Sequence, residues 1–114
     1  MNDFIYPINL NKFKEIDSTN DYLKKAKNPA NWTVILTDHQ TKGRGQKGQW
    51  LSEKGTNLSF SIYITPNQLK AVNFFLLNKL ICNAIHRVLF SFNKNISIKW
   101  PNDILLEEKK IAGI

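Results

Sequence analysis

The stretch Gly43-Arg44-Gly45-Gln46-Lys47-Gly48-Gln49-Trp50 lies between two apolar runs and predicts a loop that joins two strands. Glycine lets a backbone approach a ligand closely, and successive exposed N–H groups in such a turn form a concave nest for anions. Arg44 and Lys47 add positive charge, and Trp50 offers a flat face on which a purine could stack. The stretch therefore favours a loop that closes over a negatively charged, nucleotide-like compound. A flexible basic loop that carries a surface tryptophan is the alternative interpretation.

Strand patterns occur on both sides of this loop. Residues 33–37 are rich in β-branched side chains and predict a buried strand. Residues 57–65 alternate apolar with polar, which is typical of a strand with one covered face. Residues 4–16 alternate weakly and predict an edge strand with its lead-in, and residues 96–100 and 104–106 predict two strands separated by a turn.

Two segments predict helices. Ser18 is suited to cap a short helix that ends before residue 28, and Asp21 follows in its first turn. The sequence Thr65-Pro66-Asn67-Gln68 resembles a second capping box with proline at the first helical position. Behind it, residues 67–92 form the longest periodic segment and predict a long helix.

The composition is typical of a small globular domain. Of the 114 residues, 42% are hydrophobic, which is enough for a core, and the formal net charge of +7 favours anionic partners. The lysines are scattered and no zinc-ligand spacing occurs, so we predict neither a metal-ligand cluster nor a DNA partner. The single cysteine, Cys82, is expected to be a buried thiol in a reducing compartment. No signal peptide or membrane-length apolar run is visible, so we expect a cytoplasmic protein without a membrane partner.

Four groups of unusual residues follow one another, each at the end of a predicted element. They are Ser18-Thr19-Asn20, Gln40 with the glycine loop, Lys99-Trp100-Pro101-Asn102-Asp103 and Lys110-Ile111-Ala112-Gly113-Ile114. Binding residues concentrate at such positions on a rigid scaffold. Taken one at a time, the groups are explained by a helix cap, a turn and a solvated strand-edge lysine. Taken together, they favour a binding site.

In this order and spacing, the four groups resemble the catalytic domain of biotin protein ligases over about residues 15–114. KWPND at 99–103 followed by KIAGI at 110–114 is highly specific to that family, and QTKGRG at 40–45 with a downstream tryptophan is close to its biotin-loop motif. The resemblance implies an α/β (α+β) fold with a mixed, largely antiparallel sheet flanked by helices, like class II synthetases and biotin/lipoate ligases. Because the chain ends in an apolar segment, we expect residues 1–114 to be a partial catalytic domain, apparently incomplete. We expect neither an N-terminal helix-turn-helix domain nor a C-terminal barrel domain.

The resemblance also implies a two-step reaction. The biotin carboxylate attacks the α-phosphate of Mg-ATP and gives biotinyl-5′-AMP and pyrophosphate. A lysine of a biotin carboxyl carrier protein, from acetyl-CoA carboxylase or a related carboxylase, then attacks the activated carbonyl and releases AMP. ATP, Mg²⁺ and biotin are therefore the implied cofactors and substrates, and family members often form homodimers through their sheets.

The resemblance assigns roles by family position. The residues implied to bind biotin are Ser18, Thr19, Asn20, Gln40, Gly43, Arg44, Gly45, Lys110 and Gly113. The residues implied to bind the nucleotide are Lys47, Trp50, Lys99, Asn102 and Asp103. Catalysis would depend on Lys110 and Arg44, because cations that contact the carboxylate and the α-phosphate lower the cost of bringing two anions together.

The loop departs from the family pattern at two places. Gln46 stands where many members have arginine, and the spacing between Gly48 and Trp50 is one residue shorter. Both features predict weaker retention of the adenylate and weaker stacking by Trp50.

Three alternatives remain open from the sequence. A lipoate–protein ligase shares the fold and the adenylation chemistry, although KWPND and the GRG loop favour biotin. A truncated, non-catalytic small-molecule-binding fragment is a second alternative. A basic nucleic-acid-binding domain is the third, and it would show a steep salt dependence of affinity.

Overall fold

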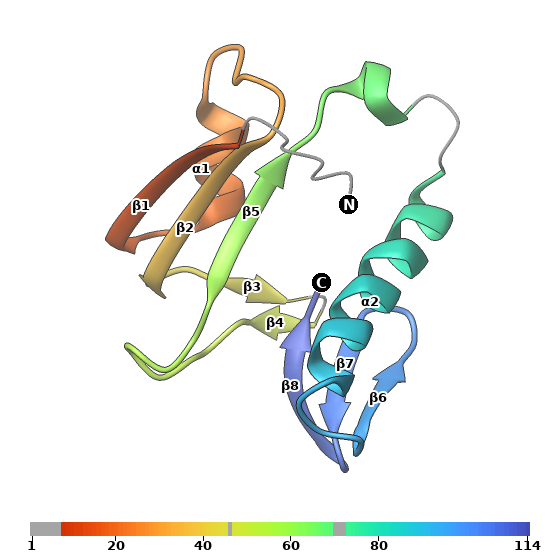
Figure 1. Ribbon diagram of the computed structural model, residues 1–114. Coiled ribbons are helices and arrows are strands. Elements are labelled where there is room, and N and C mark those ends of the chain that lie inside the picture. Colours follow the sequence, from red (N-terminus) through yellow and green to blue (C-terminus); the bar gives the residue numbers. More distant parts are fainter. Residues whose placement is uncertain (1–7, 46, 70–72) are drawn as a thin grey trace. The chain divides into compact units, whose positions relative to one another are not determined.

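The computed structural model describes residues 8–45, 47–69 and 73–114, so Gln46 and its departure from the family pattern lie outside the described part. Contacts divide the chain into two compact units, residues 1–68 and 69–114, whose helices and strands are labelled in Figure 1. The first unit holds β1 (Asn9–Ile16), α1 (Thr19–Lys25), β2 (Thr33–Gln40), β3 (Arg44–Gly45), β4 (Gly48–Gln49) and β5 (Ser59–Tyr63). The second holds α2 (Phe74–Phe90), β6 (Ile96–Lys99), β7 (Asp103–Leu106) and β8 (Lys109–Gly113). A short 3₁₀ helix, Pro66–Leu69, lies between β5 and α2 in the chain.

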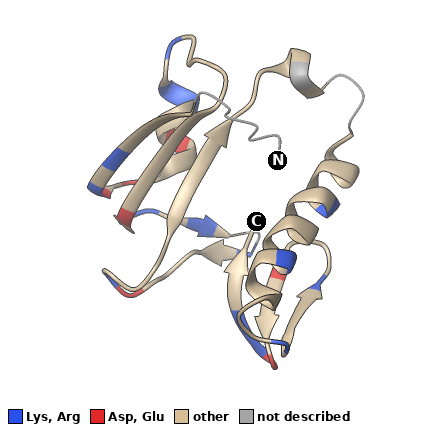
Figure 2. Ribbon diagram, in the orientation of Figure 1, with Lys and Arg blue, Asp and Glu red and all other residues tan. Residues whose placement is uncertain are grey.

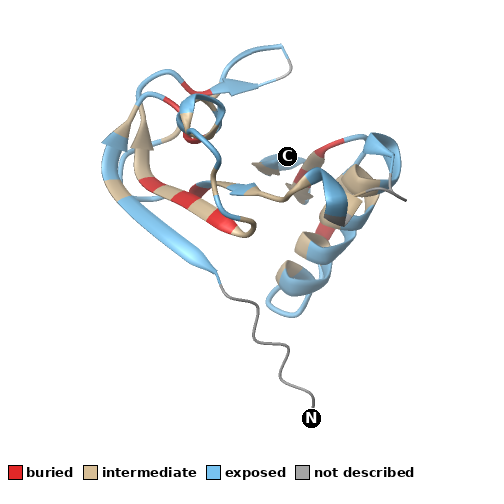
Figure 3. Cartoon of the chain, turned by 90° about the horizontal axis from the view of Figure 1, so that it is seen from above, coloured by how far each residue is buried: buried red, intermediate tan, exposed pale blue. Residues whose placement is uncertain are grey.

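The central strand of the first unit is β2, which pairs in parallel with β1 and antiparallel with β5. Alternate residues of β2, namely Thr33, Ile35 and Thr37, are buried (Figure 3). Helix α1 contacts β2 and β5. The predicted buried strand is confirmed, and β1 is an edge strand among the described residues, while residues 4–7 of that prediction lie outside them.

Strand β5 exposes its apolar side chains and covers its polar ones, the reverse of the usual arrangement in an alternating strand. Phe60 and Ile62 are 45% and 44% exposed, whereas Ser59 is 9% exposed and Ser61 is half-buried. An alternating strand normally buries its apolar side chains. The covered face of β5 is therefore the polar one, which calls for hydrogen-bond partners on that face.

Helix α1 begins where its capping pattern predicts. The backbone N–H of Asp21 donates to Ser18 Oγ at 3.3 Å, and Ser18 has the extended backbone of a helix cap. Asp21 also places a negative charge in the first turn, which the helix dipole favours. Ser18 and Thr19 are both buried, so the start of α1 is held firmly in the unit.

The second unit packs α2 on a three-stranded antiparallel sheet with the order β6-β7-β8. Its core consists of Cys82, Ile96 and Ile104, which confirms the buried thiol. The predicted start of the long helix is wrong. Asn73 is in an extended conformation and its Oδ1 accepts the N–H of Leu76 at 2.8 Å, so the α-helix starts at Phe74, and residues 70–72 lie outside the described part.

The strand pairing is mixed and mainly antiparallel, as expected. Only β1 and β2 are parallel among the described pairs, and the other four pairs are antiparallel. Among the described residues, the hydrogen-bonded strand orders are β1-β2-β5, β3-β4 and β6-β7-β8. Lysines and arginines occur on elements of both units (Figure 2). No described helix has the length and apolar character needed to cross a membrane.

Candidate functional site

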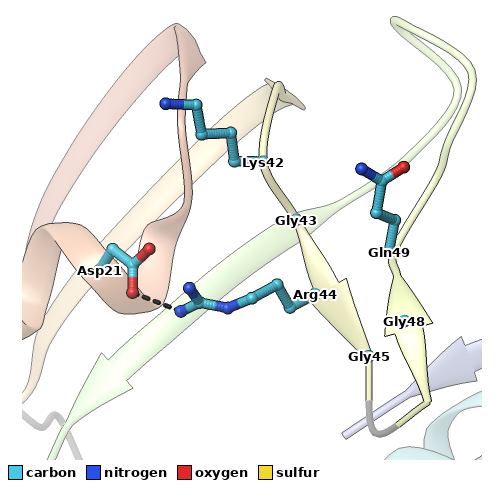
Figure 4. A pocket seen from close by; sticks show the side chains of 7 residues that line it. All are labelled: Asp21, Lys42, Gly43, Arg44, Gly45, Gly48 and Gln49. Carbon is cyan, nitrogen blue, oxygen red and sulfur yellow. Dashed lines mark hydrogen bonds and ion pairs between the residues drawn. The ribbon is translucent and has the colours of Figure 1, made fainter.

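The glycine loop forms a small hairpin. Strands β3 and β4 pair Arg44 with Gln49 and Gly45 with Gly48, and the N–H of Trp50 donates to the carbonyl of Gly43 at 2.8 Å. Gly48 has a backbone φ of +140°, which residues other than glycine rarely adopt. A hollow of about 530 Å³ lies on this hairpin (Figure 4). Its lining residues are Asp21, Lys42, Gly43, Arg44, Gly45, Gly48 and Gln49.

Gly43 is buried at the start of the hairpin. A Cβ atom at this position would lie 2.8 Å from Gln40 Nε2 and 2.9 Å from the carbonyl oxygen of Trp50. Both distances are shorter than a carbon atom tolerates. The loop therefore requires glycine at residue 43 for packing, because only a residue without a side chain leaves room there for the Trp50 backbone and the Gln40 side chain.

Gln40 and Thr19 are joined although 21 residues separate them. Gln40 Oε1 accepts the backbone N–H of Thr19 at 2.8 Å and the Thr19 hydroxyl at 3.1 Å. Thr19 Oγ1 also lies 2.8 Å from Ser61 Oγ, and Ser61 Oγ lies 2.5 Å from Asn20 Oδ1. The predicted biotin-binding residues Thr19, Asn20 and Gln40 are thus brought together, with Ser61 between two of them.

Arg44 reaches from β3 to the first turn of α1, where its guanidinium meets the carboxylate of Asp21 at 2.5 Å (Figure 4). The Arg44 side chain is 59% exposed and that of Asp21 is 27% exposed. A pair this open to solvent contributes little to stability, so an anion that enters the hollow can compete with Asp21 for the guanidinium.

The base of the loop is tied to the end of β1. The N–H groups of Thr41 and Lys42 donate to the carbonyls of Ile16 and Asp17 at 3.0 and 2.8 Å. The Thr41 hydroxyl donates to Asp17 Oδ1 at 2.9 Å, and Lys42 Nζ lies 3.6 Å from Asp17 Oδ2. The hydrogen bond from Thr41, which has the larger effect, and the charge of Lys42 hold the pKa of Asp17 below its ordinary value.

A second group of candidate residues meets on β7 and β8. Lys110 Nζ lies 2.8 Å from Asp103 Oδ1, a buried oxygen, and Asp103 pairs with Gly113 in the strand register. Asn102 is 8% exposed; its Nδ2 donates to the carbonyl of Ile114 at 3.0 Å, and its own carbonyl accepts the N–H of Ile114 at 2.9 Å. The KWPND and KIAGI motifs are therefore adjacent parts of one hairpin.

The turn of KWPND is held by α2. The carbonyl oxygen of Pro101 accepts a hydrogen bond from Asn78 Nδ2 and lies 3.5 Å from Cys82 Sγ. Burial, and then the nearby charge of Asp103, raise the pKa of the Cys82 thiol. Cys82 therefore remains a thiol that packs under the turn, which agrees with the role the sequence predicts for it.

The candidate residues fall into one group on each unit. Ser18, Thr19, Asn20, Gln40 and the loop glycines with Arg44 belong to the first, and Lys99, Asn102, Asp103, Lys110 and Gly113 belong to the second. Lys47 and Lys99 are exposed and Trp50 is half-buried, so a contact of these residues with a nucleotide stays a prediction.

Two residues of the first group were not predicted as site residues. Ser61 lies within the predicted strand over residues 57–65, and Asp21 was assigned only to the helix start. Ser61 contacts Thr19, which lies 42 positions away in the chain. Asp21 contacts Arg44, which lies 23 positions away. A serine on the covered face of an alternating strand is the signal that could have identified Ser61.

The model of the biotin/lipoate A/B protein ligase family matches residues 12–114. This chain belongs to that family. In the chain as described, no three His, Cys, Asp or Glu side chains gather as a metal site. The matched residues include all four motifs.

Several members of the biotin/lipoate ligase family are similar to this chain. The bifunctional ligase/repressor BirA of Escherichia coli is 31% identical over 103 residues, which are 87% of this chain and 32% of that protein. The biotin–[acetyl-CoA-carboxylase] ligase of Paracoccus denitrificans is 31% identical over 102 residues, which cover 86% of this chain and 42% of that protein. The chain thus spans about a third of the length of BirA.

Solved structures show the same fold. The biotin protein ligase of Aquifex aeolicus in complex with biotin and ATP is 37% identical, with a TM-score of 0.79, over 92% of this chain and 44% of that chain. The biotin protein ligase of Leishmania major in complex with biotinyl-5-AMP is 28% identical, with a TM-score of 0.80, over 95% of this chain and 51% of that chain. The fold class expected from the sequence is therefore confirmed over the residues that these structures cover.

Proposed function

We propose that this chain carries substrate-binding elements of a biotin protein ligase, which forms biotinyl-5′-AMP from biotin and ATP and transfers biotin to a lysine of a carrier protein. The observation that carries the proposal is the hydrogen-bonded meeting of Thr19 and Gln40 beside Gly43. It joins two motifs that are far apart in the chain into one polar cluster next to a glycine loop.

The chemistry of this cluster suits the head group of biotin. A ureido ring presents N–H donors and one carbonyl acceptor, and it needs a set of hydroxyl and carboxamide partners. Thr19, Asn20, Gln40 and Ser61 supply such groups within one hydrogen-bonded set. Ser18 uses its hydroxyl to cap α1, so its role in the proposed site includes holding the helix start in place.

The cations of the two groups suit the acidic end of biotin and the phosphates. In the first step, the biotin carboxylate attacks the α-phosphorus of ATP, a P–O bond forms, and the bond to pyrophosphate breaks. In the second, a lysine amine attacks the acyl carbon and AMP leaves. We assign Arg44 and Lys110 to stabilising the anions, each after exchanging its present partner, Asp21 or Asp103.

The nucleotide residues of the proposal are Lys47, Trp50, Lys99, Asn102 and Asp103. Asp103 fits a magnesium ion held jointly with nucleotide phosphates, because Mg²⁺ prefers oxygen ligands and usually takes only one or two protein carboxylates. When bound, such an ion neutralises phosphate charge. Asn102 is locked to Ile114 by two hydrogen bonds, so it positions the turn that carries Asp103.

The proposed partner is a biotin carboxyl carrier protein. The relatives described above are biotin ligases, so we favour biotin over lipoate as the substrate. Pairing of two copies through their sheets stays a prediction, and its measurement is the molar mass of the chain in solution.

The test is a calorimetric titration of this chain with biotin and with a non-hydrolysable biotinyl-adenylate analogue. The matched variants are Lys110→Ala and Lys109→Ala, because the two lysines are neighbours on β8 and both are exposed. We expect saturable adenylate binding that Lys110→Ala weakens at least tenfold and Lys109→Ala leaves within twofold. Absence of binding by the folded chain, or equal losses in both variants, would overturn the proposal, and stronger binding of a lipoyl-adenylate analogue would transfer it to lipoate.

A further inference from the structure

Ser61 occupies an unusual position for a strand residue. It lies on the covered face of β5, opposite Ile35 of β2, which is 1% exposed. On the same strand, Phe60 and Ile62 are left exposed. Covering a hydroxyl while exposing two large apolar side chains is unfavourable unless the hydroxyl has partners. The partners of Ser61 are the side chains of Thr19 and Asn20.

The protons of this cluster can be counted. Thr19 Oγ1 lies 3.1 Å from Gln40 Oε1 and 2.8 Å from Ser61 Oγ, and Ser61 Oγ lies 2.5 Å from Asn20 Oδ1. These three contacts join four oxygen atoms, but the two hydroxyls supply only two protons. A 180° turn of the Asn20 carboxamide, whose oxygen and nitrogen are assigned from such networks, brings an N–H to Ser61 Oγ.

After this rotation of the Asn20 carboxamide, all the hydrogen bonds of the cluster run in one direction. Asn20 Nδ2 donates to Ser61, Ser61 donates to Thr19, and Thr19 donates to Gln40 Oε1. Gln40 Oε1 is in turn fixed by the backbone N–H of Thr19 at 2.8 Å. Every hydroxyl then has one donor and one acceptor partner, and Asn20 Oδ1 and Gln40 Nε2 are left to accept from and donate to a ligand.

We propose that Ser61 is a positioning residue of the biotin-binding site, whose hydroxyl sets the direction of the hydrogen bonds through Asn20 and Thr19. This inference rests on the proposed function. Ser61 acts through its two neighbours, so its removal changes how they present their polar atoms to the head group. Loss of one such hydrogen bond is expected to weaken biotin binding about fivefold to tenfold.

The chain offers a matched control in Ser59. It lies two residues earlier on β5, faces the same side and is 9% exposed, and its side chain makes no hydrogen bond within the described residues. Ser61→Ala and Ser59→Ala remove the same atom from the same face of the same strand. Only the first removes a link between Thr19 and Asn20.

The experiment is a biotin titration of the full chain with Ser61→Ala, Ser59→Ala, Asn20→Ala and the double variant at 20 and 61. We expect Ser61→Ala to weaken binding fivefold to tenfold, Ser59→Ala to stay within twofold, and the double variant to lose less than the product of its single changes. If Ser61 had only a structural role, the affinity losses of the two single variants would multiply in the double variant. Each loss would then follow the fraction of unfolded protein. In NMR spectra, the side-chain NH₂ protons of Asn20 should exchange slowly with water in the wild-type chain and in Ser59→Ala. In Ser61→Ala, this exchange should become fast.

The failures are distinguishable. If the wild-type chain binds biotin and Ser61→Ala binds it equally well, only the positioning role is overturned. Multiplicative losses, or an Asn20 NH₂ signal that ignores Ser61→Ala, overturn it as well. If the folded wild-type chain binds no biotin, the proposed function fails and the role of Ser61 in a biotin site fails with it.

Discussion

Replacing Gly43 with alanine tests how the glycine loop is packed. The added Cβ would lie 2.8 Å from Gln40 Nε2, 2.9 Å from the Trp50 carbonyl oxygen and 3.3 Å from Trp50 Cβ. The Trp50 backbone is itself held by its N–H, which donates to the Gly43 carbonyl at 2.8 Å. Relief therefore requires that the Gln40 carboxamide shifts, which disturbs its hydrogen bonds to Thr19, and that the hairpin opens to move the Trp50 backbone away.

The magnitude follows from three contributions. Overpacking costs about 1–3 kcal/mol, and a lost hydrogen bond costs about 1 kcal/mol. The smaller entropy of the unfolded alanine chain offsets about 0.4–1 kcal/mol. We expect Gly43→Ala to lower the free energy of unfolding of the first unit by about 2 kcal/mol, which is roughly 10 °C in Tm for a unit of this size.

The assay is chemical denaturation followed by circular dichroism, together with hydrogen exchange of the Thr19 and Trp50 amides. Gly45→Ala is the control, because its Cβ would lie 3.7 Å from the nearest atom, the carbonyl oxygen of Gly48, which is ordinary contact. We expect that control to change stability by less than about 0.5 kcal/mol. If Gly43→Ala is as stable as Gly45→Ala and both amides keep their protection, the packing argument is refuted.

Three further predictions follow from single contacts. The pKa of the exposed Asp17 carboxyl is lowered from its ordinary value of 3.8, so its contribution to stability is present above pH 3.8 and is lost as the pH falls through the folded-state pKa. Thr41→Val removes the hydroxyl that donates to Asp17 and should raise this pKa in an NMR titration. An unchanged pKa would contradict the assigned cause. Asp21→Asn should cost less than about 1 kcal/mol in urea denaturation, because its pair with Arg44 is open to solvent; a loss above 2 kcal/mol would contradict this. Burial raises the pKa of the Cys82 thiol, so a thiol reagent at pH 8 should label the native chain far more slowly than the denatured chain, and equal rates would place the thiol at the surface.

Elements whose signals are local could be predicted from the sequence. The Ser18 cap, the buried alternation of β2 and the turn between β6 and β7 each depend on residues within a few positions of one another. The start of α2 was misplaced because two capping patterns compete within a short segment. Pro66 favours a helical turn, but the Asn73 side chain captures the N–H of Leu76 and starts the α-helix there.

The residue order is enough to recognise the family, the succession of the four motifs and the residue types that suit a biotin site. Tertiary structure alone decided which side chains meet. Thr19 reaches Gln40 across 21 residues and Ser61 across 42, and no local pattern encodes such contacts. The alternation of β5 defined two faces, but the polar one was covered because its hydroxyl has partners on α1. Burial of a polar group depends on whether distant partners satisfy it, and only the folded chain brings those partners together.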